Sequence, residues 1–247
     1  MLYLHNFTEV YEKQDFYKNF DYKIFENKKL SGVRGYMDEK SGKYLLDEIK
    51  NTGELSSLHF LDSGNYHHLS RLYIDLIKHP FDLVVYDNHT DMQFSAFGNI
   101  LSCGSWIADA YKTCENIHNI IIVGANAQYI KDCEFNNDER IIFACSIFDV
   151  NMAEKNLPIY ISVDKDVLSK EEFVSDWDQG KMSLVTLTEE LRYLAGHFNI
   201  IGADVCGEPV IGDDYNIGLS NNINKELANI FVDILYEICY NQRCIPN

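Results

Sequence analysis

Short apolar runs alternate with longer amphipathic stretches along most of the chain. The clearest apolar runs are residues 58–61, 81–86, 119–123, 140–144, 159–163 and 199–203, and weaker ones lie at residues 2–4 and 32–35. Continuous runs of this length, rich in valine and isoleucine, are typical of strands buried on both faces, as in a parallel sheet. We therefore expect these runs to form the strands of a mainly parallel sheet.

The stretches between the runs predict helices. Residues 67–78 place apolar side chains at helical spacing, and residues 222–239 do the same near the C-terminus. Residues 186–189, Thr-Leu-Thr-Glu, have the form of a capping box, which predicts a helix over residues 186–195. No repeat or linker interrupts the alternation, so we expect one doubly wound α/β domain over residues 1–247.

A run of polar residues follows the strand expected at residues 81–86. Asp87, His89 and Asp91 occupy alternate positions there. Because side chains of an extended chain alternate in direction, all three can point the same way. Carboxylate oxygens combined with one imidazole suit a divalent ion such as Mn²⁺.

Other expected strands end in similar residues. Asp164 and Asp166 follow the strand at residues 159–163, and His67 follows the one at residues 58–61. Four carboxylates in one pocket repel one another unless cations balance them. Two divalent ions would balance them, with His67 and His89 as neutral ligands, and a water shared by the two ions would become a hydroxide nucleophile.

These motifs resemble those of a known family. Residues 87–91 (Asp-Asn-His-Thr-Asp), 162–166 (Ser-Val-Asp-Lys-Asp) and 64–67 (Gly-Asn-Tyr-His) resemble motifs of the ureohydrolases, the family of arginase, agmatinase and formimidoylglutamase. The resemblance covers roughly residues 58–240. It implies a three-layer αβα sandwich with a doubly wound, mainly parallel sheet, and two Mn²⁺ ions per chain.

The resemblance also implies roles for individual residues. Asp87 and Asp164 would bridge the two ions, His67 and Asp91 would complete one site, and His89 and Asp166 would complete the other. Glu208 is similar to the family glutamate that holds the substrate guanidinium.

The chain departs from the family pattern at several positions. Tyr66 stands where the family has an aspartate, and residues 98–106 lack the histidine that shuttles protons in arginases. Glu208 lies one residue later, relative to Asp204, than the family spacing suggests. The loop at residues 177–182 also differs from the glycine-rich form of the family. These departures affect the substrate-binding side more than the metal ligands.

Composition limits the classes of binding partner and the cellular compartment that we expect for this protein. The 247 residues carry a formal net charge of -17, which argues against nucleic acid and anionic membranes as partners. The 7 cysteines show no paired Cys-x-x-Cys spacing, and the N-terminus carries no signal-like or membrane-spanning segment. We therefore expect a cytoplasmic protein with a small cationic or polar nitrogen-containing substrate. A homo-oligomer is compatible with the sequence.

The function predicted from these observations is a binuclear manganese-dependent hydrolase. A metal-bridging hydroxide would attack a guanidine, an amidine or a related C–N bond, and Asp91 would pass a proton to the leaving amine. Glu208 and Asp178 would orient the cationic end of the substrate. Two alternatives stay open: an amide hydrolase related to the deacetylases, and a non-catalytic member that binds a metal or a ligand. The sequence leaves open the substrate, the filling of both metal sites and the group that replaces the missing shuttle histidine.

Overall fold

An eight-stranded sheet forms the centre of the molecule. We describe it from a computed structural model that covers residues 1–52, 57–94, 100–151, 157–209 and 214–243, with side chains described as far as residue 232. The strand order is β2-β1-β4-β10-β9-β5-β7-β8, and every neighbouring pair is parallel. The strands are β1 (Leu2–Asn6), β2 (Tyr22–Glu26), β4 (Leu58–Phe60), β5 (Phe81–Tyr86), β7 (Ile117–Val123), β8 (Ile141–Ala144), β9 (Ile159–Asp164) and β10 (Ile200–Cys206). The predicted parallel sheet is thus confirmed.

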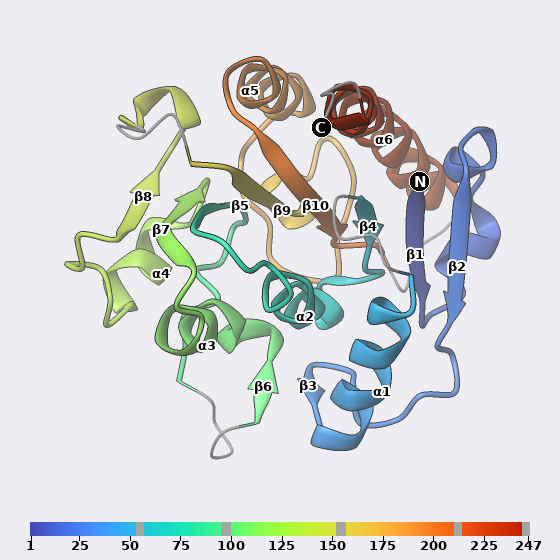
Figure 1. The fold of residues 1–247 in the computed structure, drawn as a ribbon, viewed down its shortest axis with the longest axis horizontal. Coiled ribbons are helices and arrows are strands. Elements are labelled where there is room, and N and C mark those ends of the chain that lie inside the picture. The colour runs from blue at the N-terminus through green and yellow to red at the C-terminus, as the bar shows by residue number, and fades with distance from the viewer. Residues whose placement is uncertain (53–56, 95–99, 152–156, 210–213, 244–247) are drawn as a thin grey trace.

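Helices cover both faces of this sheet. Figure 1 shows α5 and α6 on one face and α1, α2 and α3 on the other, which gives the predicted three-layer αβα arrangement. The helices are α1 (Glu39–Lys50), α2 (Ser70–Ile74), α3 (Trp106–Thr113), α4 (Ala127–Asp132), α5 (Leu184–His197) and α6 (Asp214–Arg243). Short 3-10 helices are η1 (Val10–Lys13), η2 (Phe16–Asn19), η3 (Gly64–Leu69), η4 (Cys103–Ser105), η5 (Ile147–Asp149) and η6 (Lys165–Val167), and β3 (Tyr36–Met37) pairs with β6 (Leu101–Ser102) in a separate antiparallel sheet. None of the helices in the described part of the chain has the length and apolar character needed to span a bilayer.

The buried strands divide the core into two halves. On β5, Val84 and Tyr86 pack into the cluster beneath α5 and α6, while Leu83 and Val85 pack into the cluster beneath α2 and α3. All four side chains are fully buried. This two-sided burial is why the strand appears in the sequence as an unbroken apolar run.

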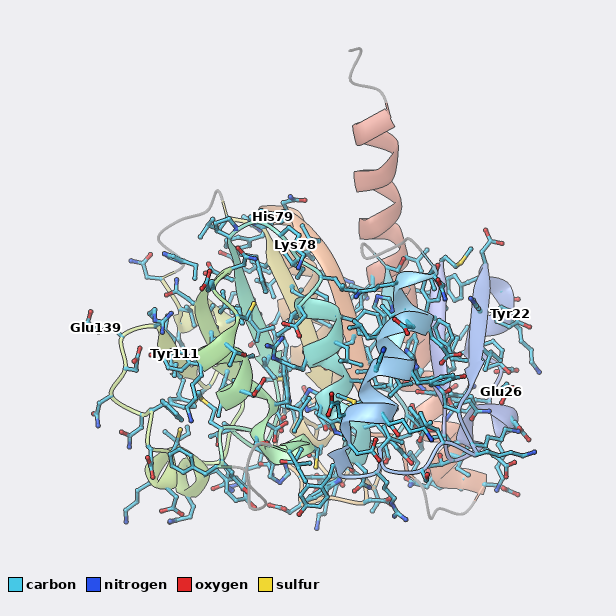
Figure 2. All side chains as sticks on the ribbon, turned by 60° about the horizontal axis from the view of Figure 1, so that its bottom comes forward. Tyr22, Glu26, Lys78, His79, Tyr111 and Glu139 are labelled. Carbon is cyan, nitrogen blue, oxygen red and sulfur yellow. The ribbon has the colours of Figure 1, made fainter. Side chains whose placement is uncertain are left out.

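The sheet fixes where the strand ends lie. Figure 2 shows Tyr22 of β2 and Glu139, which precedes β8, at opposite edges of the molecule. Tyr22 begins β2 and Glu26 ends it, so the carboxyl ends of the parallel strands lie on the side where Glu26 is labelled. Ligand sites of open α/β sheets form at this carboxyl edge, where the acidic motifs also lie.

Some predicted elements differ from the observed ones. The helix expected at residues 67–78 is a 3-10 helix (η3) followed by the short α2, which ends at Ile74. The helix α5 begins earlier than expected, because the side chain of Ser183, and not that of Thr186, caps it by accepting a hydrogen bond from the Thr186 N–H. Residues 32–35 form a turn instead of a strand, with positive φ angles at Gly32 and Gly35.

Other elements were missed. The edge strand β2 carries exposed side chains at Tyr22 and Lys23 and therefore lacks an apolar run. The helix α1 buries only Ser41, Leu45 and Ile49, so its apolar stripe is narrow.

The buried histidine His5 makes the stability of the fold sensitive to acid. Its imidazole bonds Tyr73 and Asn27, and burial lowers its pKa from 6.5 to about 3. The native state therefore keeps His5 neutral while the unfolded chain binds a proton below about pH 6.5, so this contribution to stability is complete above that pH and is lost as the pH falls toward 3. We expect the stability difference between wild type and His5→Gln to shrink by about 2–3 kcal/mol between about pH 7 and about pH 4.5, as measured by urea unfolding. A difference that does not change with pH would contradict this assignment.

Candidate metal centre

The register of the sheet brings the two acidic motifs together. Tyr86 of β5 pairs with Val163 of the neighbouring β9, so Asp87 and Asp164 follow at the same level on adjacent strands. Asp166 lies two residues after Asp164, in the 3-10 helix η6, and its Oδ1 accepts a hydrogen bond from the Asn88 N–H. Asp87, Asp164 and Asp166 are each at most 3% exposed.

His67 points one ring nitrogen into this group of carboxylates. Its Nδ1 lies 2.9 Å from Asp91 Oδ2, 3.3 Å from Asp87 Oδ2 and 3.6 Å from Asp164 Oδ2. The imidazole is 1% exposed and packs against Trp106. One nitrogen and three carboxylate oxygens thus surround a common point.

The other nitrogen of His67 is fixed by a chain of hydrogen bonds. Ser162 Oγ donates to Asp204 Oδ1 at 2.6 Å, and Asp204 also accepts from the Tyr160 hydroxyl. Because the Ser162 hydroxyl has one hydrogen, it must accept from His67 Nε2, at 2.9 Å. The neutral imidazole then carries its proton on Nε2 and presents the lone pair of Nδ1 to the carboxylates, which is the tautomer a metal ligand needs.

His89 has the same arrangement on the other side of Asp87. Its Nδ1 lies 2.9 Å from Asp166 Oδ2 and 3.4 Å from Asp87 Oδ1. Its Nε2 lies 3.1 Å from Asp178 Oδ1, and Asp178 also accepts from the hydroxyl of Tyr129. Asp87 therefore lies between two similar groups, one around each histidine.

Asp91 is held in an unusual backbone conformation. Its φ is +47°, and its carbonyl accepts the N–H of Ile107 at the start of α3. Its Oδ2 accepts a hydrogen bond from Trp106 Nε1 at 2.8 Å. These contacts hold its carboxylate beside His67.

The electrostatics of the group fit bound cations. Burial raises the pKa of Asp87, and the nearby Asp91 raises it further. Burial and the charge of Asp87 raise the pKa of Asp166 to about 7. Asp87 Oδ2 is buried and accepts no hydrogen bond from any residue that the structure describes. A set of oxygen and nitrogen donors with excess negative charge and an unbonded buried oxygen is what a divalent ion would satisfy.

A cavity of about 510 Å³ lies over the group. Asp87, His89, Asp91, Asp164 and Asp166 line its floor, so the carboxylates are accessible to a small molecule. The remaining lining residues are Arg34, Gly35, Tyr36, Gly64, Asn65, Gln93, Phe94, Ser102, Cys103, Gly104 and Trp177.

Glu208 does not lie where the sequence suggested. Its carboxylate is 1% exposed and bonds Lys165 Nζ at 2.5 Å, with Gln14, Ser220 and Asn224 completing a closed network. Gly207 (φ +90°) turns the chain here, and a Cβ at this position would lie 2.5 Å from Asp164 Oδ1. Glu208 does not line the cavity, so its predicted roles in catalysis and substrate binding do not agree with its position.

Asp178 also has a different position from the one expected of a substrate contact. Its carboxylate faces His89 and Tyr129, and the residue does not line the cavity. An acceptor on the outer nitrogen of a ligating histidine fixes the ring's orientation and tautomer. The position of Asp178 therefore fits the support of His89 and not the orientation of a substrate.

The structure brings together all six residues predicted as metal ligands, His67, Asp87, His89, Asp91, Asp164 and Asp166. It adds neighbours that the sequence reasoning missed. Ser162 and Trp106 orient His67 and Asp91, and Cys206 lies beside Asp164. Two of these neighbours, Ser162 and Cys206, could have been found from the sequence. Each stands two residues away from an aspartate on the same strand, Ser162 from Asp164 and Cys206 from Asp204, so each points to the same face of the sheet as that aspartate.

Comparison with known proteins places the chain in a family. No protein-family profile matches the sequence. An uncharacterized protein of Thermotoga maritima is 31% identical over 245 residues, which span 96% of this chain and 92% of that protein. The chain belongs to the same family as this Thermotoga maritima protein.

Solved structures show which fold this chain has. An agmatine ureohydrolase of Thermoplasma volcanium has a TM-score of 0.67 at 14% identity, covering 99% of this chain and 91% of its own. Arginase from Bacillus cereus has a TM-score of 0.63 at 16% identity, covering 93% and 97%. Formimidoylglutamase from Bacillus subtilis has a TM-score of 0.59 at 16% identity, covering 77% and 67%. The chain therefore has the ureohydrolase fold, as its motifs predicted.

Proposed function

We propose that this chain is a hydrolase with two divalent metal ions that cleaves the C–N bond of a guanidine, an amidine or a related compound. The observation that carries the proposal is the pair of matching groups around Asp87. His67 Nδ1 and His89 Nδ1 face Asp87 from two sides, and each is joined by further carboxylates. Mn²⁺ fits the donors around His89, which are imidazole nitrogen and carboxylate oxygen only.

The residues that line the cavity suggest which group would perform each step of such a reaction. Bound divalent ions would acidify a water molecule and stabilise the charge that develops at the attacked carbon. Asp91 lines the cavity with its Oδ2 held by Trp106, so its carboxyl group is fixed at the point of reaction. It would take a proton from the attacking water and donate it to the leaving amine as the C–N bond breaks.

A second candidate is hydrolysis of an amide. It is favoured by the positions of Glu208 and Asp178, neither of which lines the cavity to hold a guanidinium group. In this case the cleaved bond would still be a C–N bond, but the substrate would lack the planar cation. The two candidates differ in substrate and not in the metal-binding residues.

The test of the proposed function is a substrate panel. Protein purified without chelators would be incubated with Mn²⁺ and with guanidines, amidines and N-acetylated amines, and the release of urea, ammonia or acetate would be measured. We expect turnover of guanidines or amidines that stops on chelation and returns with added metal. Acetate release alone would favour the amide hydrolase. No turnover of any compound by protein that holds two metal ions would favour the non-catalytic role.

Asp178→Asn tests whether the outer partner of His89 supports metal binding. We expect a loss of about 10- to 100-fold in Mn²⁺ affinity, because Asn no longer offers a charged acceptor to the Nε2 proton. Titration with a competing chelator measures this change. Asp149→Asn removes the same charge at an exposed position outside the site and should leave the affinity unchanged. Equal affinity in both variants would contradict the supporting role of Asp178.

A further inference from the structure

Cys206 lies in the same row as the carboxylates at the strand ends. In the sheet, Cys206 of β10 pairs with Asp164 of β9, and Asp164 is level with Asp87 beyond β5. Paired residues of neighbouring strands point to the same face of a sheet. The side chains of Asp87, Asp164 and Cys206 therefore point to one side, although only the first two match the ureohydrolase motifs.

The thiol is close enough to share an ion with its neighbours. Cys206 is fully buried, and its Sγ lies 3.1 Å from Asp164 Oδ2. Cys206, Asp164 and His67 each offer a ligand atom, and these atoms lie within 4.8 Å of one another. Two ligands of one small divalent ion are about 3.3–3.7 Å apart when the bonds are about 2.0–2.3 Å long. The 3.6 Å between His67 Nδ1 and Asp164 Oδ2 lies in this range, and the 3.1 Å between Cys206 Sγ and Asp164 Oδ2 is slightly shorter than it.

We propose that Cys206 is a thiolate ligand of the metal site around His67. Binding of the ion would form an S–metal bond and release the thiol proton to the solvent, with no change in oxidation state. The site around His67 would then have nitrogen, oxygen and sulfur donors, while the site around His89 has nitrogen and oxygen donors only. Thiolate favours Zn²⁺, Fe²⁺ or Co²⁺ over Mn²⁺. The two sites would therefore differ in their order of metal preference, and both would still take up Mn²⁺ when it is the ion supplied in excess.

The competing role for Cys206 is that of a hydrogen-bond donor. The S–H would donate to Asp164 Oδ2 and position that carboxylate without contacting the ion. A spectroscopic measurement separates the two roles, because only a metal–sulfur bond gives charge-transfer absorption. This inference rests on the metal centre of the proposed function, so its test reads the metal–sulfur bond and the metal content separately.

The experiment is cobalt substitution of the metal-free full chain. With two Co²⁺ bound per chain, we expect a near-ultraviolet thiolate-to-cobalt absorption band in wild type. Cys206→Ala and Cys206→Val should lose the band and keep the weak visible bands of the cobalt at the His89 site. Cys103→Ala is the matched control, because Cys103 lines the cavity over the same group and its loss should leave the band intact.

Three outcomes would overturn the proposal. The first is two bound Co²⁺ ions without the band, which leaves the proposed function standing. The second is a band that persists in Cys206→Ala. The third is the absence of bound cobalt, which would contradict the metal centre itself. Circular dichroism of each variant confirms that it is folded, and the smaller Ala and the larger Val bracket the volume of the buried thiol.

A separate observation concerns Arg34, which lines the cavity together with the carboxylates. Arg34 is the only lysine or arginine among its described lining residues, whereas four carboxylates line the floor. The side chain is exposed, and within the described residues it has no ion pair or hydrogen bond. The Arg34 guanidinium is therefore available to a ligand in the cavity.

The loop that carries Arg34 is fixed on both sides. The Gly35 N–H donates to the Asn65 carbonyl at 2.9 Å, and the Gly35 carbonyl accepts the Cys103 N–H at 3.0 Å. Gly35 has a φ of +73°, which suits glycine, so the turn after Arg34 has a defined shape. Asn65 and Cys103 both line the cavity, and these bonds therefore fix the backbone of Arg34 to its wall.

From this arrangement we infer that Arg34 binds a carboxylate at the far end of the substrate. The inference rests on the proposed function, in which the reacting C–N group lies over the aspartates. Arginine presents a planar set of donors that matches a carboxylate. The substrate class would then be a guanidino or amidino acid rather than a simple amine.

A matched pair of compounds tests this inference. Agmatine and 4-guanidinobutyrate share the guanidinium and nearly the same length, but end in an ammonium and a carboxylate. We expect 4-guanidinobutyrate to bind more tightly in calorimetry with Mn²⁺-loaded protein, and Arg34→Gln to weaken its binding about 10- to 100-fold without weakening that of agmatine. Lys43→Gln, on the exposed face of α1, removes the same charge and should change neither. Equal or weaker binding of the acid would overturn the inference whether or not either compound is hydrolysed.

Discussion

Asp87→Asn is expected to abolish binding of both metal ions, with affinity reduced more than 100-fold at each site, because Asp87 belongs to both ligand groups. Asp166→Asn should reduce binding only at the site around His89, since Asp166 belongs to that group alone. Metal content after gel filtration with Mn²⁺ measures the difference. Wild type should hold two ions per chain, Asp166→Asn one and Asp87→Asn none.

The same substitution should stabilise the protein without metal. Burial and Asp91 raise the pKa of Asp87, so its negative charge is unfavourable in the folded state. Asn keeps the shape and removes the charge, so we expect the midpoint of thermal unfolding of metal-free Asp87→Asn to shift upward. Loss of metal together with a gain in stability excludes misfolding as the cause. Two ions retained by Asp87→Asn would contradict the shared position of Asp87.

Lys165 and Glu208 form the ion pair whose disruption should cost the most stability. Both side chains are at most 1% exposed, and the pair is completed by Ser220 and Asn224 of α6. Removing one partner leaves the other charge buried without compensation. We expect Lys165→Met to lower the free energy of unfolding by about 3–5 kcal/mol in urea denaturation of the metal-free protein.

The matching double variant provides the control. Lys165→Met with Glu208→Gln removes both charges and should recover much of the loss. Glu208→Gln alone should destabilise the protein while leaving the Michaelis constant of any substrate close to that of wild type, because Glu208 does not line the cavity. A large rise in that constant, without loss of stability, would restore the substrate-binding role that the family resemblance suggested.

The strands and the grouping of the candidate metal ligands were predictable because both follow from local patterns. Fully buried strands such as β5 and β9 appear as continuous apolar runs, and alternate residues after them point one way. The position of Lys165 between Asp164 and Asp166 also follows from this alternation, since it must point away from them, toward α6.

The environment of Glu208 and Asp178 was not predictable in the same way. Glu208 meets Gln14 from the N-terminal region and Asn224 from α6, contacts that depend on the packing of distant segments. Asp178 reaches His89 from a loop without regular secondary structure. The exposed edge strand β2 was missed because it carries no long apolar run. The short length of α2 was missed because the apolar spacing of residues 67–78 begins in the 3-10 helix η3 and continues beyond Ile74, where α2 ends.

The most direct test of a binuclear centre is a crystal of the protein soaked in Mn²⁺ and measured at the manganese absorption edge. The account predicts two anomalous peaks per chain, one among His67, Asp87, Asp91 and Asp164 and the other among Asp87, His89 and Asp166. A single peak, or no peak within the carboxylate group at saturating Mn²⁺, would contradict it.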